Sequence, residues 1–176
     1  MSIVLHGVAA GKGIAIGHAH LITRGTTEVP QYDIDPDKLD AEVARFDNAI
    51  KATRKELEQL RGAIPENAPT ELGAFISLHL MLLTDVTLSR EPIDILREQK
   101  INAEWALKQQ SDKLAAQFDS IDDDYLRERK QDMLQVVRRI HNNLVGQSNE
   151  INLAGNLFDD TVLIAHDLSP ADTVLF

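Results

Sequence analysis

Two histidines near the N-terminus are the first candidates for chemistry in this 176-residue chain. His18 and His20 alternate with Ala19 and Leu21, a pattern that predicts a strand with both imidazoles on one face. Such a pair could ligate a metal ion, but no third ligand lies nearby in the sequence. Solvent-facing strand histidines are therefore the favoured interpretation.

The other motifs with chemical potential are incomplete. Gly11-Lys12-Gly13 lacks the third glycine, the Lys-Ser/Thr ending and the following amphipathic helix of a phosphate-binding loop, so it is interpreted as a structural turn. Asp122, Asp123 and Asp124 are consecutive, so on a helix their carboxylates diverge and cannot form a general acid–base pair. The sequence contains no catalytic triad, zinc-ligand set or Walker motif, and it contains no cysteine.

The composition is that of a folded, acidic protein. With 43% hydrophobic and 26% charged residues it resembles ordinary globular chains rather than disordered ones. The 28 acidic residues exceed the 18 basic ones, and a net charge of −10 argues against nucleic acid and favours a basic partner. The N-terminus lacks the features of a signal peptide, and every apolar run is shorter than a membrane span. We expect a cytoplasmic protein without membrane contact.

The residue pattern changes twice along the chain, which divides it into three zones. Residues 1–35 are rich in glycine and β-branched residues, residues 36–145 carry almost all of the helical periodicity, and residues 146–176 return to short apolar runs. The last zone contains a buried-type strand over 161–165, followed by a helix start at Ser169-Pro170. We therefore expect a helical module attached to an incomplete α/β unit, cut from a longer protein.

The middle zone predicts an antiparallel bundle of about four helices. The first helix begins after Asp35 and stops before Gly62, and its apolar residues keep strict four-three spacing at Leu39, Val43, Phe46, Ile50, Thr53, Leu57 and Leu60. This heptad seam predicts packing at a shallow angle against long neighbours. A second helix is expected over about 69–84, with an interruption at Asp85-Val86. Further helices are expected from about 87 to 99, from Asn102 as N-cap to about 121, and from 122 to Gly146.

The second helix has more apolar surface than a bundle helix needs. One stripe consists of Leu72, Ile76, Leu80 and Leu83, and beside it lie Phe75, Leu78 and Leu82, with Met81 further round. Two interpretations stay open: a central helix of a larger bundle, or an exposed docking patch with an adaptable methionine. Acidic residues on the next helix and turn would give such a patch a negative rim, namely Asp119, Asp122, Asp123, Asp124 and Glu128. His79 is expected to be a packed core or interface residue rather than a catalyst.

Four sequence blocks occur here in the same order as in a known family. They are GIAIG at 13–17, HLMLLTD at 79–85, DDDYLRER at 122–129 and VLIAHDLSP at 162–170. Over essentially its whole length the chain resembles the N-terminal portion of enzyme I (phosphoenolpyruvate-protein phosphotransferase) of the bacterial sugar phosphotransferase system. The resemblance implies a mainly α fold, in which a helical HPr-binding domain is inserted into a truncated α/β phosphohistidine domain. The helical domain would be 36–145, and the α/β part would be 1–35 with 146–176.

The resemblance also implies which residues bind the phosphocarrier HPr. These would be Glu71, Phe75, His79, Met81 and Leu82 on the second helix, followed by Phe118, Asp119, Ile121, Tyr125, Leu126 and Arg129. Ser169 matches a position whose hydroxyl can hydrogen-bond the resting active-site histidine, although it also suits a helix N-cap. One departure from the family pattern is the segment 84–87, TDVT, where members are often richer in acid, so the charged rim is expected to be weaker here.

In this family the enzyme passes a phosphoryl group from phosphoenolpyruvate, through its own histidine, to HPr, using Mg²⁺. The phosphorylated histidine lies in a motif downstream of the segment at which this chain stops. The resemblance therefore implies no catalytic residue, metal site or cofactor in this chain, and no phosphotransfer activity of its own. The parent enzyme is expected to dimerise through its C-terminal half, and this chain is expected to be a monomer.

Two alternatives stay open. The first is a paralogous enzyme I of a nitrogen-related branch, which usually carries a sensory domain before this region. Met1 directly precedes the first strand here, which favours the sugar branch. The second is a structural helical bundle with no carrier partner, which a fully buried helix over 72–83 would support.

Overall fold

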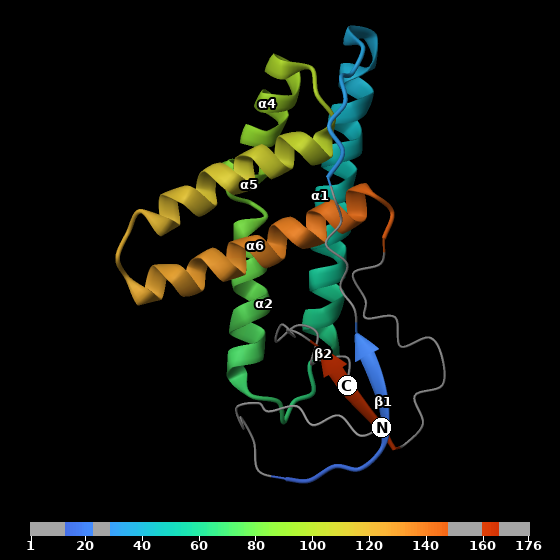
Figure 1. Ribbon diagram of the computed structural model, residues 1–176, viewed down its shortest axis with the longest axis vertical. Helices are drawn as coiled ribbons and strands as arrows, with labels where there is room; N and C mark the ends of the chain where they lie inside the picture. Colours follow the sequence, from blue (N-terminus) through green and yellow to red (C-terminus); the bar gives the residue numbers. More distant parts are fainter. Residues whose placement is uncertain (1–12, 23–28, 148–159, 166–176) are drawn as a thin grey trace, which may run out of the picture. The chain divides into compact units, whose positions relative to one another are not determined.

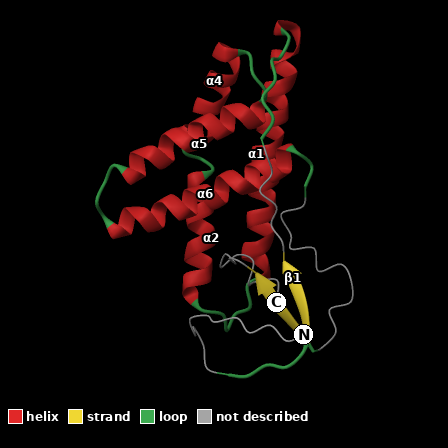
Figure 2. Cartoon of the chain, in the orientation of Figure 1, coloured by secondary structure: helices red, strands yellow, loops and turns green. Residues whose placement is uncertain are grey.

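The computed structural model describes residues 13–22, 29–147 and 160–165 (Figure 1). These residues fall into two compact units, a small sheet from 13–22 and 160–165 and a helical unit over 29–147. Figure 2 shows that helix dominates, which confirms the mainly α prediction. The expected turn at Gly11-Lys12 and the helix start at Ser169-Pro170 lie outside the described residues.

The sheet unit contains two parallel strands. β1, His18–Ile22, pairs with β2, Thr161–Ala165, in a register that runs from His18 opposite Thr161 to Ile22 opposite Ala165. A side chain at Gly17 would collide with the backbone carbonyl of Asp160, so glycine is required where the two strands begin. The His18 side chain is 79% exposed, and its Nε2 lies 3.6 Å from Asp160 Oδ2. This confirms the prediction that His18 faces solvent.

The helical unit contains a short 3₁₀ helix and six α-helices within its described residues. They are η1 (Pro36–Lys38), α1 (Leu39–Ala63), α2 (Thr70–Leu82), α3 (Val86–Ser89), α4 (Glu91–Gln99), α5 (Ala103–Asp119) and α6 (Asp124–Leu144). In Figure 1, α1 runs antiparallel to α2, and α5 runs antiparallel to α6. The pair α5–α6 crosses the first pair, so α1 also packs against α6. Helices are aligned within each pair, as the heptad seam predicts, but the two pairs are not aligned with each other.

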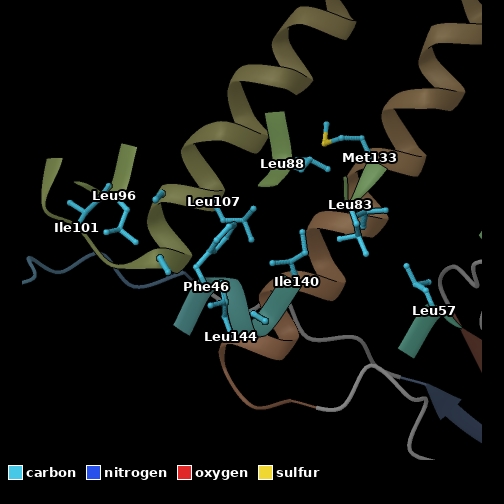
Figure 3. Packing of buried hydrophobic residues seen from close by; sticks show 14 of the residues in the cluster. Phe46, Leu57, Leu83, Leu88, Leu96, Ile101, Leu107, Met133, Ile140 and Leu144 are labelled. Carbon is cyan, nitrogen blue, oxygen red and sulfur yellow. The ribbon is translucent and has the colours of Figure 1, made fainter. Parts of the chain in front are cut away.

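The core lies where the two helix pairs meet. Phe46 and Leu57 of α1, which are 1% and 0% exposed, occupy the predicted heptad seam, and Figure 3 shows side chains from the other helices converging on the same core. Each such side chain contributes about 1.5–3 kcal/mol by burial. The polar seam residue Thr53 is satisfied, because its hydroxyl donates to Ala49 O at 2.8 Å and accepts from Asn143 Nδ2 at 3.1 Å.

The predicted interruption after α2 is confirmed. Thr84 N donates to Met81 O at 2.9 Å, which closes α2, and the Asp85 carboxylate then caps α3 by accepting from Thr87 N at 2.8 Å and Thr87 Oγ1 at 2.7 Å. No single helix within 29–147 combines the length and hydropathy needed to cross a membrane. α2 and residues 86–99 reach those values only as a pair, across a bend of 61°.

Arg45 is the centre of an ionic cluster that joins three helices. Its Nη1 and Nη2 each lie 2.7 Å from a carboxylate oxygen of Glu104 on α5, and its Nη2 donates to Glu42 Oε1 at 2.6 Å. Nη1 also donates to Leu144 O at 3.0 Å, which satisfies a carbonyl at the end of α6. Burial alone would raise the pKa of Glu104, but hydrogen bonds from Arg45 and Asn102 hold that pKa below its usual value.

Asn102 occupies the predicted N-cap position of α5, but its side chain makes no capping bond. The first amide of the helix, Ala103 N, instead donates to Glu42 Oε1 at 2.8 Å. The Asn102 side chain donates to Pro30 O at 3.0 Å and accepts from Tyr32 N at 3.1 Å. These bonds attach residues 29–35 to the helical unit, whereas residues 1–35 are predicted from the sequence to belong to the α/β part.

His79 is a polar residue within the core, because α2 turns Ile76, His79 and Leu83 to the same side. The imidazole is 0% exposed, neither ring nitrogen has a hydrogen-bond partner, and the ring lies 4.1 Å from that of Phe75, tilted by 51°. Burial lowers the pKa of His79 from 6.5 to about 4, and the positive charge of Arg139 adds to this effect. His79 is therefore neutral at pH 7.

Arg45→Ala tests the ionic cluster. Loss of the guanidinium leaves Glu42 and Glu104 side by side without their cation, and the Glu104 side chain is only 7% exposed. We expect the free energy of unfolding to fall by about 2–4 kcal/mol, measured by urea denaturation. The matched control is Arg97→Ala, which removes an exposed ion pair to Asp40 on α1 and should cost at most about 1 kcal/mol. Equal losses in the two variants would contradict a central role for the cluster.

His79→Leu tests the neutral buried imidazole through the pH dependence of stability. The unfolded chain protonates His79 near pH 6.5, whereas the folded chain protonates it only near pH 4. Stability from this group is therefore complete above pH 6.5 and is lost as the pH falls towards 4. Between pH 7 and pH 4 the free energy of unfolding of the unmodified chain should fall by about 3 kcal/mol more than that of the variant. Parallel pH profiles would show that His79 titrates normally in the fold.

Candidate docking surface

The outward side of α2 carries one strongly exposed apolar residue. Met81 is 61% exposed, whereas Ile76 and Leu83 on the opposite side are 0% and 1% exposed. Phe75 and Leu82 lie between these extremes, because each packs partly on the core and keeps part of its surface accessible. The second apolar stripe is therefore neither fully buried nor fully exposed, and Met81, further round the helix, is more exposed than the residues of that stripe.

The side chain of His79, one of the predicted docking residues, is buried in the core. The spacing of 76, 79 and 83 directs its side chain into the core, where a partner protein cannot reach it. Its ring lies against that of the partly exposed Phe75. Glu71, in the first turn of α2, is exposed as the prediction requires.

A second group of predicted residues lies at the turn between α5 and α6. Phe118 is half-buried, Ile121 is 46% exposed and Asp119 is exposed. Arg129 on α6 is half-buried, and its Nη1 lies 3.2 Å from Asp132 Oδ2. The side chains of Tyr125 and Leu126 lie outside the described residues, as does Ser169. The predicted docking residues therefore come from two places, the outward side of α2 and the α5–α6 turn.

Part of the predicted acidic rim is neutralised within the chain. Lys130 Nζ lies 2.6 Å from Asp119 Oδ2, so this carboxylate already has a cation. Asp85 is occupied as the cap of α3, and its hydrogen bonds with Thr87 lower the pKa of its carboxyl. The carboxylate of Glu91 accepts from Lys113 Nζ at 3.0 Å. Of the predicted rim, Asp119 is therefore offset by a cation, and Asp85 and Glu91 are neighbouring carboxylates outside that rim.

Two features of this surface were missed from the sequence. Val86, the first residue of α3, is 62% exposed, and an apolar residue directly after a capping aspartate was the available signal. The ion pair between Lys130 and Asp119 has no local signal, because it joins two helices across a turn. Among the described residues no group of three histidine, aspartate or glutamate side chains could hold a metal ion.

Comparison with known proteins shows which family this chain belongs to. Residues 6–129 match the family described as "PEP-utilising enzyme, N-terminal". The phosphoenolpyruvate-protein phosphotransferase of Cupriavidus necator is 43% identical over 183 residues, which cover 100% of this chain and 31% of the relative. The enzyme of the same name from Bacillus subtilis is 34% identical over 96% of this chain and 29% of its own length. The chain thus spans about three tenths of the curated relatives that it matches.

Two solved structures share the fold. A solution NMR structure of an Enzyme I (nEIt) protein aligns with a TM-score of 0.78 at 32% identity, covering 96% of this chain and 67% of that one. The N-terminal domain of an Enzyme 1 of the nitrogen type aligns with a TM-score of 0.65 at 25% identity, covering 93% and 66%. The resemblance drawn from the four sequence blocks is confirmed, and the chain belongs to the PEP-utilising enzyme, N-terminal family.

Proposed function

We propose that this chain is the N-terminal part of a phosphoenolpyruvate-protein phosphotransferase and that its helical unit docks the small phosphocarrier protein HPr. Relatives of that name match the chain along its full length. The observation that carries the docking role is the 61% exposure of Met81, on a helix whose opposite side forms the core. A large apolar side chain held outward on a rigid helix is the kind of anchor that protein interfaces use.

The proposed mechanism at this surface is recognition. Met81 and the accessible parts of Phe75 and Leu82 provide apolar contact. Glu71 and the acidic turn after α5, which contains Asp122 and Asp123, attract a basic partner and orient it during the encounter. Phosphoryl transfer between two histidines needs in-line placement more than it needs further functional groups, so docking supplies the positioning. His79 is inaccessible and serves here as a core residue, not as a nucleophile.

The remaining chemistry belongs, in this proposal, to the parent protein outside this chain. Phosphoenolpyruvate, the Mg²⁺ ion and the phosphorylated histidine are assigned there, and the parent is assigned to the cytoplasm as a homodimer. This chain by itself would be a monomer that binds HPr without transferring phosphate. No step at the docking surface requires a metal ion.

Of the two alternatives, the nitrogen-type enzyme fits less well. The TM-score of 0.65 to that structure is lower than the 0.78 to the other solved structure, and the identity is 25% against 32%. A structural bundle without a partner predicts a buried helix over 72–83, and the exposure of Met81 argues against this.

Met81→Asp tests the docking role. In an NMR titration of the labelled chain with unphosphorylated HPr, we expect shifts at residues 71–86 and 118–121, and the variant should lose at least about tenfold in affinity. Its circular dichroism should be unchanged, because the side chain is exposed. Leu57→Asp is the contrasting variant, and it should unfold the helical unit because Leu57 is 0% exposed. Shifts confined to 13–22 and 160–165, or unchanged affinity in the variant, would refute the proposal.

A further inference from the structure

The bend between α2 and α3 exposes two large hydrophobic side chains. The described residues of the helical unit include four large exposed hydrophobics, and their exposed fractions are 47% for Tyr32, 61% for Met81, 62% for Val86 and 46% for Ile121. The two most exposed, Met81 and Val86, stand five residues apart on either side of one bend. Single exposed apolar residues are common on protein surfaces, but two at one corner beside the partly exposed Leu82 form a cluster.

The polar side chains of the same corner make hydrogen bonds to other groups of the bend. Thr84 Oγ1 donates to Met81 O at 2.7 Å, and Thr87 Oγ1 donates to Asp85 Oδ1 at 2.7 Å. Asp85 Oδ1 also accepts from Thr87 N, so its charge is engaged at the start of α3. The polar side chains at this corner therefore bond within the bend, although Thr84 and Asp85 are exposed. Met81 and Val86 are the large apolar side chains that the corner exposes.

Met81 and Val86 are close enough to meet one partner. Five residues of trans backbone span at most about 18 Å. A standard protein interface buries about 800 Å² on each partner, which corresponds to a patch roughly 30 Å across. A partner centred on the bend is therefore wide enough to contact both Met81 and the start of α3.

We propose that Val86 and Met81 together form an apolar anchor at the α2–α3 bend, and that the phosphocarrier presents an uncharged apolar side chain to this corner. The inference rests on the proposed function and adds a specificity-determining residue to it. The cationic groups of the carrier are then matched by Glu71 at one end of α2 and by the acidic turn after α5, not by the bend. Asp85 is a structural cap and takes no part in steering.

Two substitutions separate these roles while preserving the fold. Val86 is the first residue of α3, where an acidic side chain is favoured by the helix dipole, so Val86→Glu should fold normally. Asn is as good an N-cap as Asp, so Asp85→Asn keeps the cap and removes only the charge. Gln59→Glu, at an exposed position of α1, controls for an added negative charge elsewhere.

The test measures binding of the 176-residue chain to unphosphorylated HPr by calorimetry and stopped flow, at about 0.05 M and about 0.5 M salt. We expect Val86→Glu to weaken binding at least about tenfold at both salt concentrations, and Gln59→Glu to change it less than about twofold. Asp85→Asn should leave the association rate and its salt dependence unchanged.

Three outcomes would overturn the inference. If the unmodified chain binds HPr and Val86→Glu binds equally well or better, the bend is not an apolar anchor, although the proposed function stands. If Asp85→Asn slows association and reduces its salt dependence, Asp85 steers the partner and the corner is electrostatic. If the unmodified chain does not bind HPr at all, both the proposed function and this inference fail.

Discussion

The rotation of α2 about its own axis is the constraint on which the surface depends. Successive residues of an α-helix are turned by about 100°, so burying Ile76, His79 and Leu83 on one side directs Met81 to the other. The helix is apolar around most of its circumference, and packing against α1 and α6 selects which apolar residues are covered. The outward direction of the Met81 side chain follows from which positions of α2 are covered. A rotation of α2 about its axis by one residue position, about 100°, would move Met81 towards the covered side and bring Leu80 or Leu82 to the outside.

The scaffold that fixes this rotation is held by charge as well as by burial. The Arg45 cluster bonds α1 to α5 through Glu104 and reaches a terminal carbonyl of α6 at Leu144. Glu42 of the same cluster supplies the acceptor for the first amide of α5. One arginine thus joins three of the four long helices. Its two ionic partners, Glu42 and Glu104, are largely withdrawn from water, so each bond is stronger than an exposed ion pair. A surface mounted on such a framework can be presented to a partner with little rearrangement, because the residues beneath it are already ordered.

Local patterns predicted much of this fold. The four-three spacing of α1, the helix interruption at Asp85-Val86 and Gly146 after α6, with its positive φ of 68°, were each readable from neighbouring residues. The rotation of α2 was not, because Leu80 and His79 both complete a regular stripe with Ile76, and only the packed structure distinguishes them. Likewise, nothing near Asn102 in the sequence indicates that its amide bonds to residues 70 or more positions earlier. Long-range polar partners carry no periodicity, so sequence patterns place helices more reliably than they place side chains.

The distribution of charge limits how the acidic composition can act. Of the carboxylates near the candidate surface, Asp119 is paired with Lys130, Glu91 with Lys113, and Asp85 is occupied by Thr87. At physiological ionic strength the field of an exposed charge decays over about 8 Å, so distant carboxylates cannot replace these as contacts. The net charge of −10 then favours the approach of a basic partner in general, whereas the choice among basic partners falls to the apolar residues that remain exposed. In the proposed docking, recognition at the α2 surface is therefore governed more by shape and hydrophobic contact than by ion pairing.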